Sequence, residues 1–398
     1  MKEIYLDHAA SAPMDPRVLE AMLPYLTTSE ANPSSLHSPG LRTKEAVTSA
    51  RKSIADILNC RDEEAIFTSG GTESDNLAII GITRALAAGG KHVITSAIEH
   101  PAVLEPLAHL QKTGAIKLTI LPVDRFGMVD PKTVTAAIRP DTILISIMYA
   151  NNEIGTIQPI ADIGREILKW RKNNSTQLPY FHTDACQAAG ACLMDVEKLH
   201  VDAMSVNGSK IYGPKGAGFL YLQRGVQIEP LFHGGGQERN IRPGTENVPG
   251  IVGLATALSI AREEMEKENA RLTILRDRLV EGLLAIPKTR LNGHPTERLP
   301  NNVNVSFLDI EGEAAVLYLD AEKIFVSTGS ACASASLDPS HVILATGMSY
   351  EAAHGSLRFT LGRQTSEEDI DRVIAVMPGV VQKLRAMSPV NLDMKYFE

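Results

Sequence analysis

The strongest constraint on the fold is a regular alternation of short strand-like runs and longer helix-like segments through the first half of the chain. The strand-like runs are short and apolar, whereas the segments between them repeat apolar residues at helical spacing. Such alternation predicts an α/β fold with a mostly parallel central sheet that helices cover on both faces. We expect strands at 65–67, 92–95, 116–121, 142–149 and 180–182, and helices at 72–88, 102–111, 131–138 and 160–172.

Residues 201–206 and 218–222 look like the last two strands of this sheet. A long polar helix with apolar stripes is expected at 252–284, and it leads to a second unit. The elements expected in that unit are 302–307, 313–319, 324–326, 356–360 and a closing helix from 366. With 398 residues, 44% of them hydrophobic, the chain is long enough for two or three units. We expect a large domain at 16–255, a smaller α+β domain at 256–398, and an N-terminal segment, 1–15, that contributes to the small domain.

Composition excludes several classes of protein. The formal net charge of -8 argues against direct nucleic-acid binding, which usually needs a basic face. No apolar run approaches the roughly 18 residues of a membrane span, and the N-terminus does not resemble a secretory signal. The 4 cysteines form no CxxC pair and no zinc-type cluster with histidine, so neither a disulfide framework nor a metal site is expected. A reducing compartment, the cytoplasm, fits this cysteine usage.

Lys210 is the first candidate for chemistry. It follows the run Ser-Val-Asn-Gly-Ser at 205–209, where a strand ends in a turn of small residues. A lysine at such a turn can form a Schiff base, while its polar neighbours can reach a phosphate. A lysine considered alone is nearly always a solvated surface charge, so this interpretation depends on the accompanying motifs.

Asp184 and Gln187 follow the strand expected at 180–182. Open α/β sheets bind ligands at the carboxyl ends of their strands. A carboxylate there can keep the ring nitrogen of pyridoxal 5'-phosphate (PLP) protonated, which makes the ring an electron sink, and Gln187 could contact the ring oxygen. The alternative is that Asp184 is simply the N-cap of the next helix.

A glycine pair at 70–71 joins the strand at 65–67 to the following helix, and Thr72 comes directly after it. Free N–H groups and the positive end of the helix dipole make such a turn suitable for binding an anion. The motif is neither a P-loop nor a GxGxxG sequence, so it does not favour a nucleotide. The alternative is an ordinary capped helix start, with Thr72 or Ser69 as the cap.

Three further polar residues have the chemistry of an active site. His100 follows a short buried strand, and an imidazole there can stack on a flat ring or move protons. Arg358 stands on an otherwise apolar strand, where it needs an anionic partner, and its planar fork suits a substrate carboxylate. Asn152 could place an amide donor beside the same carboxylate. A lone histidine, however, is more often structural.

Cys332 lies in a segment, 327–336, that consists almost entirely of small residues. Such a segment can bury little and is expected to be mobile. Because the neighbours of Cys332 are serines and alanines, the thiol is expected to be exposed and able to visit a cofactor. The alternative is an incidental loop cysteine.

Together these motifs resemble the cysteine desulfurases of the IscS/NifS type, within the class V aminotransferase branch of fold-type I PLP enzymes. The resemblance runs from Tyr5-Leu-Asp-His-Ala-Ala to at least Arg363, and the segment around Cys332 is similar to that of the IscS/NifS group. It implies the PLP-dependent transferase fold. The matching segments lie at 67–76, 151–156, 210–216, 233–236 and 329–336.

The resemblance also implies roles for individual residues. Lys210 would hold the cofactor and remove a substrate proton, Asp184 would pair with the ring nitrogen, and His100 would stack on the ring and move protons. The remaining roles implied are Gln187 at the ring oxygen, Gly71, Thr72, Asn207 and Ser209 at the phosphate, Thr245 reaching the phosphate of the partner in a homodimer, and Asn152 and Arg358 at the substrate carboxylate.

The activity implied is removal of sulfur from L-cysteine, which gives L-alanine and a persulfide on Cys332. The persulfide would pass to an acceptor protein, either an iron–sulfur scaffold or a tRNA-thiolation protein. One departure concerns the phosphate site, because the family usually has serine and then histidine where this chain has Asn207 and Ser209. Both can hydrogen-bond a phosphate, but they supply less positive charge. Cys186 is a second thiol near the site and has no assigned role.

Three rival interpretations stay open. A selenocysteine lyase or a class V aminotransferase would keep Lys210 and Asp184 but would not need a thiol in a long loop. A comparison of cysteine with selenocysteine turnover tests the first, and a requirement for a keto acid reveals the second. The third rival is a non-catalytic, partner-binding subunit with impaired PLP binding, which would lack the yellow colour of a PLP protein.

Overall fold

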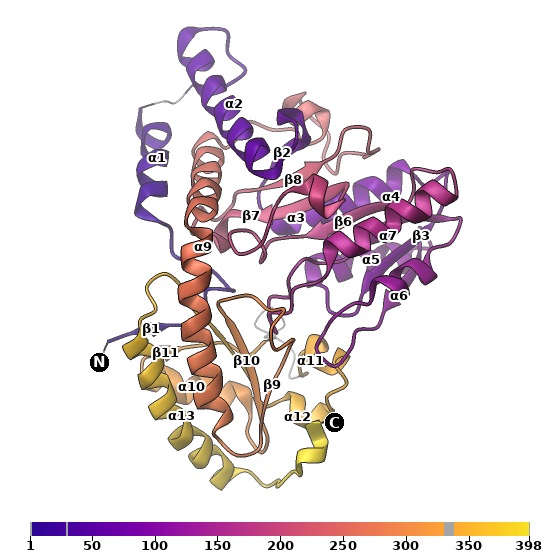
Figure 1. The fold of residues 1–398 in the computed structure, drawn as a ribbon. Coiled ribbons are helices and arrows are strands. Elements are labelled where there is room, and N and C mark those ends of the chain that lie inside the picture. Colours follow the sequence, from indigo (N-terminus) through magenta and orange to yellow (C-terminus); the bar gives the residue numbers. More distant parts are fainter. Residues whose placement is uncertain (1, 29–30, 330–337, 398) are drawn as a thin grey trace.

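The computed structural model describes residues 2–28, 31–329 and 338–397 (Figure 1). Its upper part in Figure 1 is built on a seven-stranded sheet with the order β2-β8-β7-β6-β5-β3-β4. The strands are β2 (Ala65–Thr68), β3 (His92–Ser96), β4 (Lys117–Leu121), β5 (Thr142–Ser146), β6 (Tyr180–Asp184), β7 (Ala203–Asn207) and β8 (Gly218–Leu222). Five of them, from β4 to β7, are parallel, and β8 runs antiparallel to both β7 and β2. The mostly parallel sheet expected from the sequence is confirmed.

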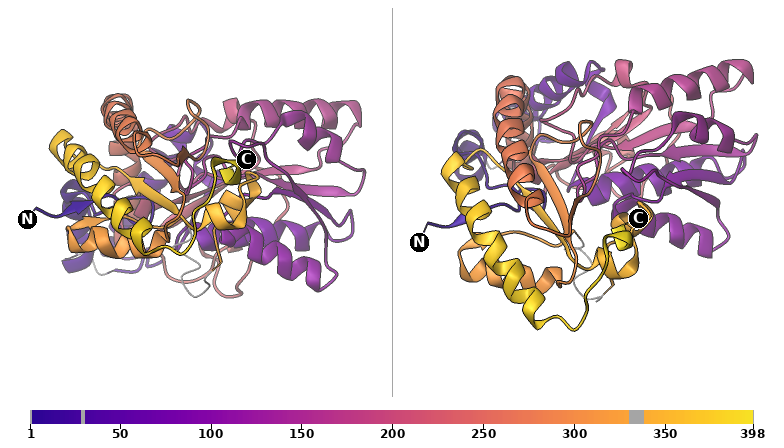
Figure 2. Two further views of the ribbon diagram at one scale, coloured as in Figure 1. Left: turned by 90° about the horizontal axis from the view of Figure 1, so that it is seen from below. Right: turned by 60° about the horizontal axis from the view of Figure 1, so that its bottom comes forward.

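The sheet has a buried apolar core on each face. Phe181 and Met204 belong to one core, whereas their chain neighbours Tyr180 and Ala203 belong to the other. Burial on both faces explains why these strands read as continuous apolar runs. Helices lie on both sides of the sheet in the left view of Figure 2. The covering helices are α3 (Gly71–Asn76), α4 (Ile82–Ala85), α5 (Pro101–Lys112), α6 (Pro131–Ala137) and α7 (Ile160–Asn173).

Helix α9 (Val248–Leu284) runs from the upper to the lower part of the molecule in Figure 1. Its first half is buried in the upper core, and its second half is buried in a separate lower core. It packs against α1 (Pro16–Thr27) and α2 (Ser38–Leu58) above and against α13 (Glu367–Met387) below. The long helix expected from the sequence is therefore present and joins the two parts.

The lower part contains a three-stranded antiparallel sheet with the order β12-β10-β9. Its strands are β9 (Thr289–Leu291), β10 (Asn302–Phe307) and β12 (Ser356–Thr360). The helices around it are α10 (Gly312–Ala321), α11 (His341–Ala345), α12 (Tyr350–Ala353) and α13. Apolar side chains of this sheet, of α13 and of the second half of α9 form the lower core.

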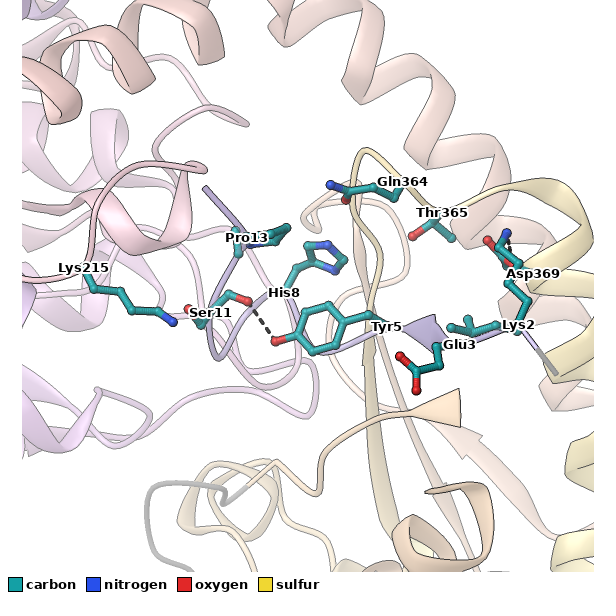
Figure 3. Close-up of a pocket in the computed structure, with 12 residues that line it drawn as sticks. Lys2, Glu3, Tyr5, His8, Ser11, Pro13, Lys215, Gln364, Thr365 and Asp369 are labelled. Atoms are coloured by element: carbon teal, nitrogen blue, oxygen red, sulfur yellow. Dashed lines mark hydrogen bonds and ion pairs between the residues drawn. The ribbon is translucent and has the colours of Figure 1, made fainter. Parts of the chain in front are cut away.

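The N-terminal segment joins the lower part. Strand β1 (Ile4–Tyr5) pairs in parallel with β11 (Ile324–Phe325), and the segment continues beside β12. Figure 3 shows a pocket along this segment, in which the Tyr5 hydroxyl donates to the backbone oxygen of Ser11 at 2.8 Å. The segment then turns back to the upper part, so it connects both parts of the molecule.

Some helices were not expected from the sequence, namely α1, α2, α11 and α12. Proline in the first turn of α1, directly after the N-cap Asp15, is a sequence signal for the start of a helix. The helix expected at 72–88 is present as α3, a π-helical turn at Leu77–Gly81, and α4. Short helical turns also occur at Asp62–Glu64, Val196–Leu199 (α8), Gly208–Lys210, Gln237–Asn240 and Met394–Phe397. No helix in the described ranges has the length and apolar character needed to cross a bilayer.

Candidate active site

A cavity of ≈ 570 Å³ lies where β5, β6 and β7 end, between the upper and lower parts. Carboxyl ends of parallel strands are the expected place for a ligand site in an open α/β sheet. The cavity is lined by nine of the residues proposed from the sequence: Gly71, Thr72, His100, Asn152, Asp184, Gln187, Asn207, Lys210 and Arg358. Ser209 and Thr245 are described but do not line it. Cys332 belongs to 330–337, outside the described residues.

Lys210 ends the short helical turn that follows β7, and its amine lies in the cavity. Nζ donates hydrogen bonds to the backbone oxygens of Ala9 at 2.9 Å and Ala10 at 2.6 Å. Both carbonyls belong to the N-terminal segment, 200 residues away in the sequence. The position of the amine therefore depends on the return of this segment to the upper part.

Asp184 ends β6 and is buried, and its Oδ1 accepts the backbone N–H of Cys186 at 2.9 Å. Turns follow rather than a regular helix, so the alternative that Asp184 caps a helix is wrong. Burial, and then the charge of Asp184, raises the pKa of the Cys186 thiol well above its usual range. Cys186 is therefore protonated and unreactive near neutral pH. Gln187 Nε2 donates to the backbone oxygen of Ala9 at 2.9 Å.

Asp75 also lines the cavity, and the sequence reasoning missed it. Burial, followed by the charge of Asp184, raises its pKa well above the usual range. A protonated Asp75 adds no second negative charge beside Asp184. His182 Nε2 lies 3.0 Å from the Ser205 hydroxyl and 3.6 Å from Asp75 Oδ1, and burial lowers the pKa of His182 to about 4.

His100 is the N-cap of α5, and its Nδ1 accepts the backbone N–H of Ala102 at 3.0 Å. This hydrogen bond places the proton of the neutral ring on Nε2. Burial lowers the pKa of His100, while Asp184 raises it to a smaller extent. His100 is thus neutral near pH 7 and has a fixed tautomer.

The glycine pair begins the helical run of α3, and Gly70 has a φ of 147°. A Cβ on Gly71 would lie 2.6 Å from Cys186 Sγ, so a larger residue there would collide with this sulfur unless Cys186 moved. No side chain caps the helix, so neither Thr72 nor Ser69 serves as its cap. Asn207 Oδ1 accepts from both the N–H and the hydroxyl of Ser209 at 3.2 Å. Asn207 therefore lines the cavity, while Ser209 fixes its orientation.

Arg358 lies on β12 with 3% of its surface exposed. Its Nη2 donates to Asp7 Oδ1 at 2.8 Å, and its Nη1 donates to the backbone oxygen of Asn152 at 3.3 Å. The buried Nε has no hydrogen-bond partner among the described residues. The anionic partner that the sequence required for Arg358 is Asp7, which the sequence reasoning did not identify.

Glu153 was missed as well, although it directly follows Asn152. Its carboxyl is buried and accepts a hydrogen bond from the Ser340 hydroxyl. Burial raises its pKa to about 7, against the lowering effects of Ser340 and Arg358. The signal available in the sequence was the position of this glutamate within the segment 151–156, beside a candidate substrate ligand.

The comparisons with known proteins cover nearly the whole chain. Residues 4–373 match the family described as "Aminotransferase class-V". The cysteine desulfurase IscS of Methanosarcina thermophila is 57% identical over 390 residues, which cover 98% of this chain and 95% of that protein. This identity extends over both parts of the molecule, so the similarity is not confined to one of them.

Two solved structures are also similar. A NifS-like protein has a TM-score of 0.87 and 36% identity, covering 97% of this chain and 99% of that one. SspA in complex with cysteine has a TM-score of 0.78 and 36% identity, covering 90% of this chain and 99% of that one. The family and fold expected from the sequence are confirmed. The chain belongs to the cysteine desulfurases of the IscS/NifS type, within the class V aminotransferase family of PLP enzymes.

Proposed function

We propose that this protein uses PLP to convert L-cysteine to L-alanine and a persulfide on Cys332. The observation that carries the proposal is the single cavity that gathers an amine, a buried carboxylate, a neutral imidazole and an arginine. These are the groups that sulfur removal from an amino acid requires: Lys210, Asp184, His100 and Arg358.

The residues present fit PLP. Asp184 offers a buried carboxylate to the ring nitrogen, and His100 offers a neutral ring for stacking. The turn at Gly71, where a Cβ would collide with the Cys186 sulfur, and the side-chain amide of Asn207 suit a phosphate. When bound, PLP supplies an electron sink that makes the Cα proton of an amino acid acidic. Lys210 is the residue that would hold it.

The substrate carboxylate is assigned to Arg358 and Asn152. Arg358 keeps Nε without a partner among the described residues, so the guanidinium retains donor capacity that a carboxylate can use. The solved complex of SspA with cysteine supports an amino-acid site in a protein of this fold.

Two groups of the chain move protons in this account. Lys210 Nζ accepts the Cα proton of the substrate. His100 carries its own proton on Nε2, where it can donate a hydrogen bond or pass the proton on.

Sulfur transfer belongs to Cys332. Its thiolate attacks the sulfur of L-cysteine, so that an S–S bond forms while the bond between Cβ and sulfur breaks. The electron pair of the broken bond stays on Cβ of the substrate, which gains a proton. Lys210 returns a proton to Cα, and the product leaves as L-alanine. The persulfide then passes to an acceptor protein, an iron–sulfur scaffold or a tRNA-thiolation protein.

The active form is proposed to be a homodimer in the cytoplasm. Exposed leucines on α1 and α2 offer an apolar surface to a second copy, and Thr245, which is exposed here, would reach the partner's phosphate. A reducing compartment suits persulfide chemistry, and Cys60, Cys186 and Cys192 are free thiols. The exposed leucines are Leu19, Leu23, Leu26 and Leu41.

The test combines a spectrum with a product assay. The purified protein should absorb in the visible region, and L-cysteine should change that spectrum while alanine appears. Cys332→Ala should keep the visible absorbance and form no alanine from cysteine. Alanine formation by that variant at the full rate would contradict the persulfide step.

A further inference from the structure

Glu153 lines the cavity at the place where the upper part of the molecule meets the lower part. Its backbone oxygen accepts from the side-chain amides of Asn302 at 3.2 Å and Asn304 at 3.1 Å, both on β10. Its backbone N–H donates to Asn151 Oδ1 at 2.9 Å. These bonds hold the main chain of Glu153 against β10, the strand that pairs with β12.

Glu153 is linked to Arg358 through the cavity that both residues line and through its neighbour Asn152. Asn304 is the direct cross-strand neighbour of Arg358 in the β10–β12 pair. Glu153 and Arg358 line the same cavity, and the charge of Arg358 lowers the pKa of Glu153. Because the preceding residue, Asn152, also binds Arg358 through its backbone oxygen, the glutamate is tied directly to the carboxylate site.

The surroundings of the Glu153 carboxyl are closely packed. The Ser340 hydroxyl donates to Oε2 and also accepts the N–H of Val342 at 3.1 Å in the first turn of α11. A Cβ on Gly329 would collide with Oε2. The carboxyl therefore cannot turn away from the cavity without losing its partner, and isosteric replacement by glutamine suits the site.

The charged groups around Glu153 are few. Arg358 faces it from β12, and Asp7 lies beyond Arg358 as its ion-pair partner at 2.8 Å. Asp338 and His341 flank Ser340 and line the same cavity. The side chains that β10 presents to Glu153 are the neutral amides of Asn302 and Asn304.

We propose that Glu153 is a positioning residue that exchanges a proton with solvent when the substrate carboxylate binds. In neutral and alkaline solution it is ionised while the carboxylate site is empty, and it takes up a proton when a ligand carboxylate occupies Arg358. Arg358 already pairs with Asp7, so a ligand carboxylate adds a further negative charge to a cavity that Glu153 also lines, and protonation of Glu153 removes one of these charges. The proton balance is simple: one proton from solvent joins Glu153 for each carboxylate bound.

This inference rests on the proposed function only in assigning the substrate carboxylate to Arg358. Its test uses propionate, which has the carboxylate of alanine and no amino group. The dissociation constant of propionate is measured by NMR line broadening of its methyl signal on the PLP-loaded protein, as a function of pH. Because this readout needs no turnover, failure of desulfuration and failure of the inference are distinguishable.

The wild-type protein should bind propionate most tightly at low pH, where Glu153 is already protonated. The dissociation constant of propionate should rise with pH over about pH 6 to 9. The total rise should be about tenfold for each unit by which bound propionate raises the pKa of Glu153. Glu153→Gln should bind with the tight, low-pH constant throughout this range. Glu99→Gln is the matched control, since Glu99 is also a buried carboxyl but does not line the cavity, and it should keep the wild-type pH dependence.

Ser340→Ala provides a second variant. The hydrogen bond from Ser340 lowers the pKa of Glu153, so its loss should move the pH at which propionate binding weakens to a higher value than in the wild-type protein. Arg358→Ala should abolish the specific binding. The inference is overturned if Glu153→Gln reproduces the wild-type rise, if the wild-type constant does not change with pH, or if propionate binds Arg358→Ala as tightly as wild type. His341 is unchanged in every variant, so it cannot produce a difference between them.

Discussion

The side chains of the cavity are held by partners that lie far away in the sequence. Lys210 is bound by the carbonyls of Ala9 and Ala10, and Arg358 is bound by Asp7. All three partners belong to the short N-terminal segment beside β1. The positions of both charged groups therefore depend on the N-terminal segment, and removal of one of these partners should have a measurable effect.

Asp7→Asn should destabilise the protein because it leaves the buried guanidinium of Arg358 without its carboxylate. A lost hydrogen bond to a charged, buried group costs about 1–3 kcal/mol, and partial exposure of Asp7 keeps the loss at the lower end. The measurement is the free energy of unfolding in urea. As a control, Asp162→Asn removes an exposed ion pair with Arg165 and should change the free energy of unfolding by less than about 0.5 kcal/mol. Equal losses in both variants would contradict the account.

Glu99 gives a prediction about pH. Burial raises its pKa to about 8, while Ser96 and the N–H of Met148 donate to its Oε1. Between the pKa of Glu99 in the unfolded chain and its pKa of about 8 in the folded protein, the folded state holds a proton on Glu99 that the unfolded state has lost. The contribution of Glu99 to stability therefore falls as pH rises between these two pKa values, and it is constant above about pH 8.

Glu99→Gln should therefore gain stability relative to wild type as pH rises from about 5 to about 8, by at most about 1.4 kcal/mol per pH unit. The glutamine oxygen can still accept both hydrogen bonds. The midpoint of urea unfolding, measured at equal protein concentration, checks this. A difference between the two proteins that does not vary with pH would argue against a protonated Glu99 in the folded state.

The sequence was sufficient to select candidate residues from their local position at the end of a strand. Lys210, Asp184 and His100 each follow a strand, and the structure brings all three to one cavity. It was insufficient for Asp7 and Glu153, because their importance comes from Arg358, which is far away in the chain. Burial of Glu153 depends on contacts with β10 and Ser340 that no local pattern reveals.

Among the elements, the start of α3 matters most for the site. Gly71 approaches Cys186 so closely that a methyl group would collide with the sulfur, whereas the next nearest atom, Asn207 Cβ, would be at 3.5 Å. The glycine turn before α3 and the turn after β6 are therefore packed directly against each other. This contact gives Cys186 a role in packing that the sequence did not suggest.

Gly71→Ala should weaken PLP binding, measured by titration of the visible absorbance, by about fivefold to about a hundredfold, since crowding of this kind costs about 1–3 kcal/mol. Addition of Cys186→Ala should restore most of the affinity because it removes the colliding sulfur. Cys186→Ala alone is the control and should bind PLP nearly as wild type does. A double variant no better than Gly71→Ala would show that the sulfur is not the obstacle.

The contact between α9 and α13 offers a matched pair of substitutions. A Cβ at Gly282 on α9 would lie 2.6 Å from Ile374 Cδ1, whereas a Cβ at Gly379 on α13 would meet nothing within 4 Å. Gly379→Ala should raise the midpoint of thermal unfolding, because alanine is favoured over glycine in helices by about 1 kcal/mol. Gly282→Ala should lower it, since crowding exceeds that gain. The same sign for both changes would contradict the packing described here.

Element prediction succeeded where periodicity was strong, as in the sheet strands and α9. It did not anticipate the π-helical turn at Leu77–Gly81, because a change of helical hydrogen bonding leaves the apolar spacing nearly unaltered. It also left α11 and α12 unassigned, since they are only 5 and 4 residues long. Their positions depend on tertiary contacts, such as the hydrogen bond of Ser340 with Glu153.

At the scale of the whole molecule, the upper and lower parts are joined by α9 and by the N-terminal segment (Figure 1). The cavity lies between these two parts. The division into units at 16–255 and 256–398 stays a prediction, and α9 crosses its boundary. Because Lys210 comes from the upper part and Arg358 from the lower part, the site needs both. The sulfur transfer proposed for this protein therefore requires both parts of the molecule.

The most direct test of sulfur transfer is the mass of the protein after one turnover. The PLP-loaded protein is mixed with L-cysteine without a reductant, and alanine is quantified in the same sample. The account predicts one added sulfur atom, located on the peptide that contains Cys332, for each alanine formed, and neither product with Lys210→Ala. Alanine formed without sulfur on Cys332, or sulfur placed on another cysteine, would contradict it.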